Sequence, residues 1–259
     1  MSVPQTRAVR LPSIERLKAL TSPPGARPFR VGILIGPGFI PMDMMGVQTV
    51  FGLLPGCEIH LVWKSREPVE GLPSWWTLPT TTFAECPPEL DVFSVPMLPP
   101  EVTNDPEVLA FVATQARKAR YVIGICNGVV LLGAAGILNG KRATTSYNSL
   151  GILSELGVTE VVSDGSGVVV DGNVYTAGPG NGSVEAALLV AEAAFGRPVA
   201  EFAELVIEYD PHPPFGTGAA RRAPADQLAR FGGLMSDMID AYREGAVSAF
   251  TKAGYRDSR

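Results

Sequence analysis

Cys126 lies in a stretch whose composition is typical of a nucleophilic cysteine. The apolar run Tyr121–Ile125 precedes it, Gly124 and Gly128 stand two positions away on either side, and apolar helix formers follow. A strand that turns sharply into a helix has this pattern, and the strained residue at its apex needs small neighbours. The start of the following helix would favour the thiolate by directing N–H groups at the sulfur. The alternative is a buried structural cysteine.

Asp43 is the acid that we expect to work with this cysteine. Its neighbours in residues 41–45 are a proline and three methionines, and such a desolvating neighbourhood raises a carboxyl pKa and suits the group to proton transfer. The loops after the first and fourth strands of a parallel sheet can meet over one crevice, which would bring Asp43 beside Cys126. The alternative for Asp43 is an acid that interacts only with the dipole of its own helix.

The two histidines of the chain do not support a Cys–His–acid triad. His60 falls inside an apolar strand, and His212 lies in a proline-rich stretch far from any motif. A cysteine–carboxylate pair is therefore the better hypothesis. Cys57 and Cys86 lack the glycine-flanked turn, and we expect both to be structural.

Other motifs of the sequence receive no role in chemistry. The glycine-rich segment 178–183 lacks both the full dinucleotide fingerprint and a Walker-type lysine, so it predicts no nucleotide site. The three cysteines lack metal-type spacing and predict neither a zinc site nor a disulfide framework. Trp75 and Trp76 are expected to be packing residues or the rim of a pocket.

Strands and helices alternate along the chain in the order that a doubly wound α/β fold requires. The runs 29–35, 57–64, 91–96 and 121–125 are apolar enough for strands of a parallel sheet that is covered on both faces. Asp105-Pro106-Glu107 predicts the start of a helix that runs to about residue 120. Asp171-Gly172 predicts a tight hairpin late in the chain.

Three segments describe the expected domain organisation. Residues 1–28 form an N-terminal extension that ends in a proline-rich linker and lacks the apolar core of a secretion signal. Residues 29–215 form the catalytic domain. Residues 216–259 form a C-terminal helical extension packed on that domain, with a helix over roughly 225–245.

Composition limits the classes of partner. The chain has 259 residues, a net charge of −5 and no clustered Lys and Arg, which argues against a nucleic-acid surface. No apolar run reaches the roughly 18 residues that a membrane span requires. An odd number of cysteines favours a reducing, cytoplasmic location. A small molecule or another protein is the partner class that remains.

Several groups of residues together resemble the ThiJ/PfpI superfamily, which is class I glutamine amidotransferase-like, and within it the isonitrile hydratases. The resemblance covers residues 29–215. It rests on the strand 31–35, Asp43-x-x-Gly46, Val50-Phe51, the segment 60–64, the Cys126 turn, the segment 131–145, and the stretches 207–209 and 213–215.

The resemblance implies a flavodoxin-like three-layer sandwich, a homodimer and no cofactor. It implies that Cys126 attacks the carbon of an isonitrile, while Asp43 moves protons and activates water. The resulting thioimidate would be hydrolysed to an N-substituted formamide. The implied class is a cofactor-independent hydro-lyase that acts on a small, apolar substrate.

The chain departs from the family pattern around this pair. Asn127 stands where the family usually has threonine, and Ser146 replaces a histidine beside Tyr147. Met97-Leu98 replaces a glycine pair whose N–H groups help to bind an anion, and the two prolines that follow have no N–H. The residues expected to line the substrate and anion pocket are Asn127, Met97, Leu98, Gly46, Ser146 and Tyr147.

Three alternative functions remain open at this point. The same Cys/Asp site could serve another lyase, isomerase or cyclase reaction in secondary metabolism. The protein could instead be a non-catalytic redox or stress sensor that uses reversible oxidation of Cys126. A transcription regulator is the third alternative, and the stretch after residue 215 argues against it because it has neither the length nor the basic face of a helix-turn-helix.

Overall fold

The structure is a computed structural model that describes residues 27–54, 56–165 and 167–255. The expected N-terminal extension therefore lies almost entirely outside the described residues. Within the described part, no helix combines the length and the apolar character that crossing a membrane would require.

A central sheet of seven strands organises the described chain. Neighbouring strands pair in parallel except β10 and β11, which form the predicted antiparallel hairpin around Gly172. The strands across the sheet are β10 (Val169–Asp171), β11 (Val174–Ala177), β7 (Tyr121–Ile125), β6 (Val92–Val95), β1 (Phe29–Leu34), β2 (Cys57–Trp63) and β5 (Thr81–Thr82). The inner strands β6 and β7 are buried throughout, which explains their continuous apolar sequence.

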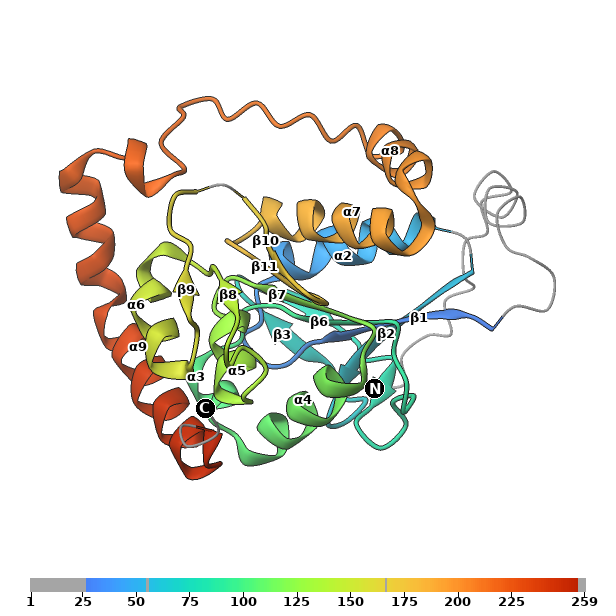
Figure 1. Ribbon diagram of the computed structural model, residues 1–259, viewed down its shortest axis with the longest axis horizontal. Coiled ribbons are helices and arrows are strands. Elements are labelled where there is room, and N and C mark those ends of the chain that lie inside the picture. Colours follow the sequence, from blue (N-terminus) through green and yellow to red (C-terminus); the bar gives the residue numbers. More distant parts are fainter. Residues whose placement is uncertain (1–26, 55, 166, 256–259) are drawn as a thin grey trace.

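Helices cover both faces of the sheet, as Figure 1 shows. On one face lie α2 (Pro41–Leu53), α7 (Asn181–Phe195) and α8 (Arg197–Val206), with α2 packed along α7. On the other lie α3 (Pro100–Thr103), α4 (Pro106–Lys118) and α5 (Gly128–Ala134). This is the predicted flavodoxin-like three-layer sandwich with a mostly parallel sheet.

The predicted start of α4 is confirmed. The Asp105 side chain accepts hydrogen bonds from the N–H groups of Glu107 and Val108, and Pro106 occupies the first helical position. The helix ends at Lys118, two residues before the expected end. Asp105 also forms an ion pair with Lys64, whose Nζ lies 2.6 Å from Asp105 Oδ2.

The region between β2 and β6 contains a hairpin, formed by β3 (Val69–Gly71) and β4 (Trp75–Thr77). Trp75 and Trp76 are 47% and 66% exposed. The packing alternative is therefore wrong, and the pocket-rim alternative stays a prediction.

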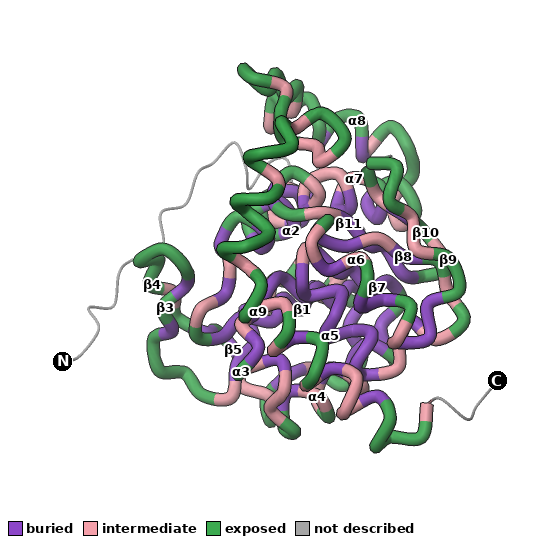
Figure 2. Tube along the Cα trace, turned by 90° about the vertical axis from the view of Figure 1, so that its left-hand side faces the viewer, coloured by how far each residue is buried: buried purple, intermediate pink, exposed green. Residues whose placement is uncertain are grey.

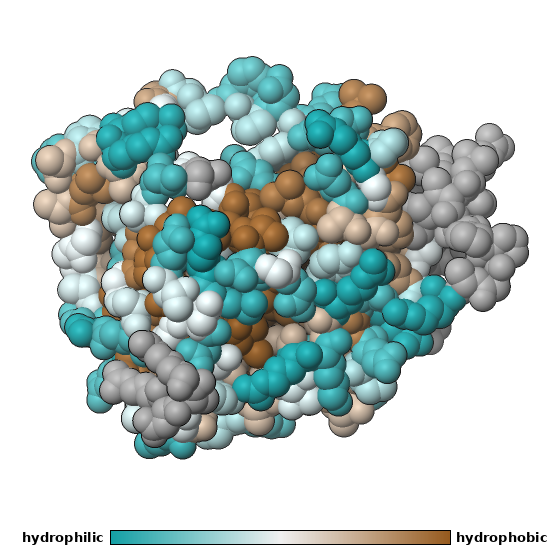
Figure 3. Space-filling model, viewed as in Figure 1, coloured by the Kyte–Doolittle hydropathy of each residue, from teal (hydrophilic) through white to brown (hydrophobic). Residues whose placement is uncertain are grey.

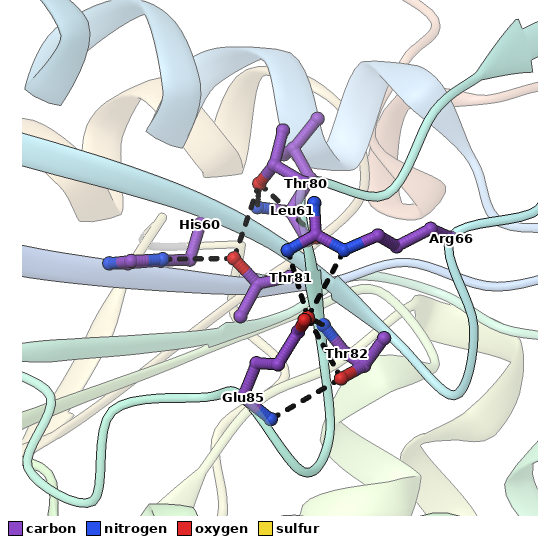
Figure 4. Close-up of polar contacts among 7 residues, drawn as sticks. All are labelled: His60, Leu61, Arg66, Thr80, Thr81, Thr82 and Glu85. Carbon is purple, nitrogen blue, oxygen red and sulfur yellow. Dashed lines mark hydrogen bonds and ion pairs between the residues drawn. The ribbon is translucent and has the colours of Figure 1, made fainter.

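The edge strand β5 pairs with β2 and is stabilised by side chains, which Figure 4 shows. His60 Nδ1 lies 3.0 Å from Thr81 Oγ1, and Arg66 forms an ion pair with Glu85 at 2.9 Å. His60 is thus part of this sheet edge, which confirms that it belongs to a strand rather than to the Cys126 turn.

A smaller subdomain follows α5. The two-residue strands β8 (Arg142–Ala143) and β9 (Glu160–Val161) pair in parallel and enclose η1 (Tyr147–Ser149), α6 (Leu150–Leu153) and η2 (Ser154–Leu156).

The C-terminal segment leaves α8, crosses the molecule through η3 (Ala220–Arg222) and ends in α9 (Ala225–Lys252). The first half of α9 is largely exposed, whereas the second half packs on α5 through Tyr242, Ala246 and Phe250. Figure 2 shows this change from exposed to buried along the helix. The helix continues to Lys252, beyond the expected residue 245, because these apolar residues bury its last turns.

Candidate active site

Cys126 occupies the predicted turn between β7 and α5. Its φ of 54° lies in the left-handed region, which is strained for a residue with a side chain. The Cys126 N–H donates to the Ala177 carbonyl at 3.0 Å, and the Cys126 carbonyl accepts from Thr145 Oγ1 at 2.6 Å. A Cβ at Gly128 would collide with the carbonyls of Val95 and Pro96, so glycine is needed there.

Asp43 is fully buried in α2 and faces Cys126. Its carboxylate accepts hydrogen bonds from the Gly180 N–H at 2.8 Å and the Met97 N–H at 3.3 Å, and it also contacts the Cys126 thiol by a hydrogen bond. These partners belong to other segments, so the carboxylate does not cap its own helix. The structure therefore brings together the two residues that the sequence paired.

Burial raises the pKa of Asp43 from 3.8 to about 6, while the three hydrogen bonds oppose that rise. The direction agrees with the sequence-based expectation, but the cause differs. Met42 and Met45 are exposed, and of the three neighbouring methionines only Met44 is buried. The desolvation therefore comes from the packed sheet and helices rather than from the adjacent methionines.

The Cys126 thiol has a raised pKa, first because it is buried and second because the Asp43 carboxylate is close. The Asn127 N–H and the Ser146 hydroxyl act in the opposite direction, but their effect is smaller. The direction is opposite to the expected favoured thiolate, because burial and the neighbouring carboxylate disfavour the charged sulfur more than the Asn127 N–H and the Ser146 hydroxyl favour it. The resting pair is a neutral thiol that donates to a carboxylate.

The Met97–Leu98 segment lines the same site from the end of β6. Its Met97 N–H points at Asp43, and its Met97 carbonyl accepts from the Ile40 N–H at 3.2 Å. The Leu98 carbonyl accepts from Thr103 Oγ1 at 3.2 Å and from the hydroxyl of Tyr242. The segment that replaces the family's glycine pair is therefore held on both sides.

Asn127 and Ser146 contact the Cys126 sulfur, whereas Tyr147 lies farther out and is more exposed. Asn127 is buried, and its Oδ1 has no hydrogen-bond partner among the described residues. Ser146 Oγ faces the Cys126 sulfur and lies 2.6 Å from Asn148 Oδ1. Tyr147 is partly exposed, and its ring packs against Phe231 of α9 with a centroid separation of 5.8 Å.

Gly46 lies where α2 crosses α7. A Cβ there would collide with Ser183, whose hydroxyl lies 2.7 Å from the Gly180 carbonyl and 3.1 Å from the Met42 carbonyl. Gly46 thus allows the two helices to approach closely, so that the start of α7 can reach Asp43.

Sequence reasoning missed three residues of this site. Gly180 was weighed only as part of a phosphate loop, although its positive φ of 68° and its position before α7 place its N–H on Asp43. Thr145 supports the carbonyl of Cys126. Tyr242 reaches the site from α9, and no local signal in the sequence points to it.

A cavity of about 490 Å³ opens beside the site, under the segment that joins α8 to α9. Figure 3 shows an opening between that segment and the body of the molecule. The cavity shares Ser146 with the surroundings of Cys126, and it is also lined by Tyr147, Gly178, Arg222 and Phe231. Among the side chains that the structure places, no group of three or more His, Cys, Asp and Glu could hold a metal ion.

Comparisons with known proteins agree with this architecture. An isonitrile hydratase of Pseudomonas putida is 39% identical over 199 residues, which are 76% of this chain and 85% of the relative. The crystal structure of a ThiJ/PfpI family protein from Pseudomonas syringae has a TM-score of 0.79 and 30% identity, over 94% of this chain and 98% of that one. Schizosaccharomyces pombe DJ-1, at 17% identity and a TM-score of 0.59, covers 70% of this chain with its entire length and shows the fold alone. The sequence model of the DJ-1/PfpI family matches residues 29–193, and the chain therefore belongs to the DJ-1/PfpI family.

Proposed function

We propose that the protein is a cofactor-independent hydratase that adds water to an isonitrile and releases an N-substituted formamide. The observation that carries this proposal is the pair of the partly buried, neutral Cys126 thiol and the fully buried Asp43 carboxylate, whose pKa is raised to about 6. The 39% identity to an isonitrile hydratase supports the choice of substrate class.

In the first step, Cys126 sulfur bonds to the isonitrile carbon. Because the thiol pKa is raised, the sulfur needs a base during the attack, and Asp43 is within hydrogen-bond reach. Asp43 accepts the thiol proton and delivers it to the same carbon. The product is a thioimidate, in which that carbon carries the sulfur, one hydrogen and a double bond to nitrogen.

In the second step, water adds to the thioimidate carbon. Asp43 accepts a proton from the water, the nitrogen gains one, and the carbon–sulfur bond breaks as the formamide carbonyl forms. The sulfur recovers its proton, so that one isonitrile and one water give one formamide and the original thiol. A carboxyl with a pKa near 6 can both accept and return protons near neutral pH.

The surrounding residues have proposed roles in binding. Asn127, Ser146, Met97 and Leu98 enclose the reacting carbon, and the neighbouring cavity holds the substituent of the isonitrile, with Tyr147 at its wall. Gly46 acts indirectly, through the helix contact that brings Gly180 to Asp43.

We also propose that residues 29–215 act as the catalytic domain, with residues 216–259 packed on it, and that the protein is a cytoplasmic homodimer. Exposed apolar side chains on the α2, α7 and α8 face support association with a second copy. They are Met45, Leu189, Phe202, Leu205 and Val206. Analytical ultracentrifugation of the full chain tests the dimer.

The test of function is incubation with a panel of aliphatic and aromatic isonitriles, followed by mass spectrometry for formamides. Wild-type protein and Cys57→Ser are expected to form them, and Cys126→Ala is not. Full activity of Cys126→Ala would contradict the proposal.

Peroxide treatment and a wider panel of electrophiles separate the alternative functions. Selective oxidation of Cys126 by mild peroxide without turnover would favour a redox sensor. The raised thiol pKa argues against that alternative, because sensor cysteines react as accessible thiolates. Failure of every isonitrile, together with Cys126-dependent conversion of another electrophile, would favour a different lyase, isomerase or cyclase reaction.

A further inference from the structure

Tyr242 links the C-terminal helix α9 to the candidate active site. It lies outside residues 29–193, which the family model matches, and its side chain is fully buried. It belongs to an apolar cluster that also contains Met97 and Val130 and that packs against the partly buried Cys126. The end of α9 is therefore part of the wall behind the nucleophile.

The Tyr242 hydroxyl donates to the Leu98 carbonyl, which also accepts from Thr103 Oγ1. Leu98 directly follows Met97, whose N–H donates to the Asp43 carboxylate. The phenol thus holds the Leu98–Pro99 peptide, and one peptide separates it from the Pro96–Met97 peptide whose N–H contacts the proposed base. The carbonyl of the intervening Met97–Leu98 peptide accepts from the Ile40 N–H, so the Leu98 carbonyl is the next fixed point along the segment, and its release would let the backbone that carries the Met97 N–H shift.

The phenol stays protonated and remains a donor. Its pKa is raised, first by burial and then by the nearby Cys126, while the Asn127 side chain acts in the opposite direction. Asp43 interacts with Cys126 from the β7–α5 turn, and the charges of Glu101 in α3 and of Asp43 also raise the pKa of the phenol. The Gly180 N–H of α7 completes the surroundings of the carboxylate.

We propose that Tyr242 is a positioning residue, whose hydroxyl holds the Met97–Leu98 segment so that the Met97 N–H stays on Asp43 and the Cys126–Asp43 pair keeps its geometry. The C-terminal helix is in this way a component of the site, although it contributes no reacting atom. The effect on turnover rests on the proposed function, whereas the effect on the Cys126–Asp43 pair does not.

The test compares Tyr242→Phe with Tyr255→Phe. The first variant removes the hydroxyl that contacts the Leu98 carbonyl and the Asn127 side chain, and the control removes a hydroxyl that lies 2.8 Å from Arg117, beyond the end of α9. The readout is the rate of Cys126 alkylation by iodoacetamide between pH 5 and 8, which needs no isonitrile. Alkylation requires Asp43 as a base, so its rate falls on the acidic side.

We expect the midpoint of that fall to move upward by about half a pH unit in Tyr242→Phe, the size of one lost neutral hydrogen bond, because Asp43 loses its Met97 donor. Tyr255→Phe is expected to match wild type. With an isonitrile that the wild-type protein hydrates, kcat of Tyr242→Phe should fall by about fivefold to tenfold. KM should stay unchanged, since the hydroxyl does not line the cavity.

A purely structural role would lower the melting temperature of Tyr242→Phe and leave the midpoint where it is, and that result would overturn the proposal. If Tyr242→Phe does not fold, Thr103→Val removes the other donor to the same carbonyl and should move the midpoint in the same direction. A wild-type protein that hydrates no isonitrile would remove the proposed function, while the alkylation midpoints would still decide the role of Tyr242.

Discussion

Two buried aspartates at opposite ends of the strands show how differently the fold treats a carboxylate. Asp91, 3% exposed at the start of β6, accepts two hydrogen bonds of 2.7 Å from the Arg27 guanidinium and one of 2.9 Å from the Arg30 N–H. Asp43, fully buried at the other end, has backbone N–H groups and a thiol around it, and no ion pair between it and a described cation is formed.

The difference lies in how the negative charge is compensated. A guanidinium neutralises Asp91 and ties the segment before β1 to the sheet, which is a structural task. Dipoles alone compensate Asp43, so its proton is held with a pKa near 6 and can be exchanged near neutral pH. A buried carboxylate without a cation beside a thiol therefore points to chemistry, and one with a cation points to stability.

Replacing each aspartate by asparagine should produce the largest difference between the two sites, and that difference is in catalytic activity. Asp43→Asn keeps the shape of the side chain but cannot accept the thiol proton, and we expect kcat for isonitrile hydration to fall by about 10²–10⁴-fold. Asp91→Asn should stay within about twofold of wild type. Comparable losses in both variants would mean that Asp43 acts through the fold rather than through proton transfer.

The pH dependence of turnover should report Asp43 and not Asp91. Because Asp43 must be ionised to accept a proton, kcat/KM is expected to fall below about pH 6, by about tenfold for each further pH unit. Steady-state rates between pH 4.5 and 8 measure this. A profile that stays flat down to pH 4.5 would contradict the assignment of Asp43 as the base.

Stability should depend on pH through Asp43 in the sense opposite to that of most aspartates. Its folded pKa lies above the ordinary 3.8, so between about pH 4 and 6 the folded protein holds a proton that the unfolded chain has released. The free energy of unfolding should therefore decrease as pH rises through this window, by at most about 3 kcal/mol.

Urea unfolding of wild type and Asp43→Asn from pH 4 to 7 measures this dependence. The variant lacks the titrating group, so its free energy of unfolding should rise relative to that of wild type as the pH increases from 4 to 6. A constant difference would show that Asp43 has the same pKa in both states.

Asp91→Ala is expected to give the smallest effect, and on stability alone. The partner Arg27 is more than half exposed and regains water, so loss of the pair and of the Arg30 hydrogen bond should lower the free energy of unfolding by about 1–2 kcal/mol. Urea unfolding measures this loss, and the matched variant Arg27→Ala should lower the free energy of unfolding by a smaller amount. A drop in kcat without a change in stability would reverse the assignments of the two aspartates.

The sequence predicted those features that depend on neighbours along the chain. The glycines around Cys126 indicate the strained turn, Asp105 marks the start of α4, and Asp171-Gly172 marks the hairpin, because each is a local backbone requirement. The alternation of apolar runs predicted the three-layer α/β sandwich for the same reason. The topology of a parallel sheet and the family resemblance both paired Asp43 with Cys126.

Tertiary structure decided what depends on burial and on charges from distant segments. The thiol pKa rises although the turn alone predicts a thiolate, and Trp76 is exposed although its apolar ring predicts packing. Gly180 and Tyr242 reach the site from α7 and α9, and no spacing near Cys126 could indicate them. Local sequence determines backbone conformation, whereas desolvation and hydrogen-bond partners are properties of the packed chain, and these set how protons move at Cys126 and Asp43.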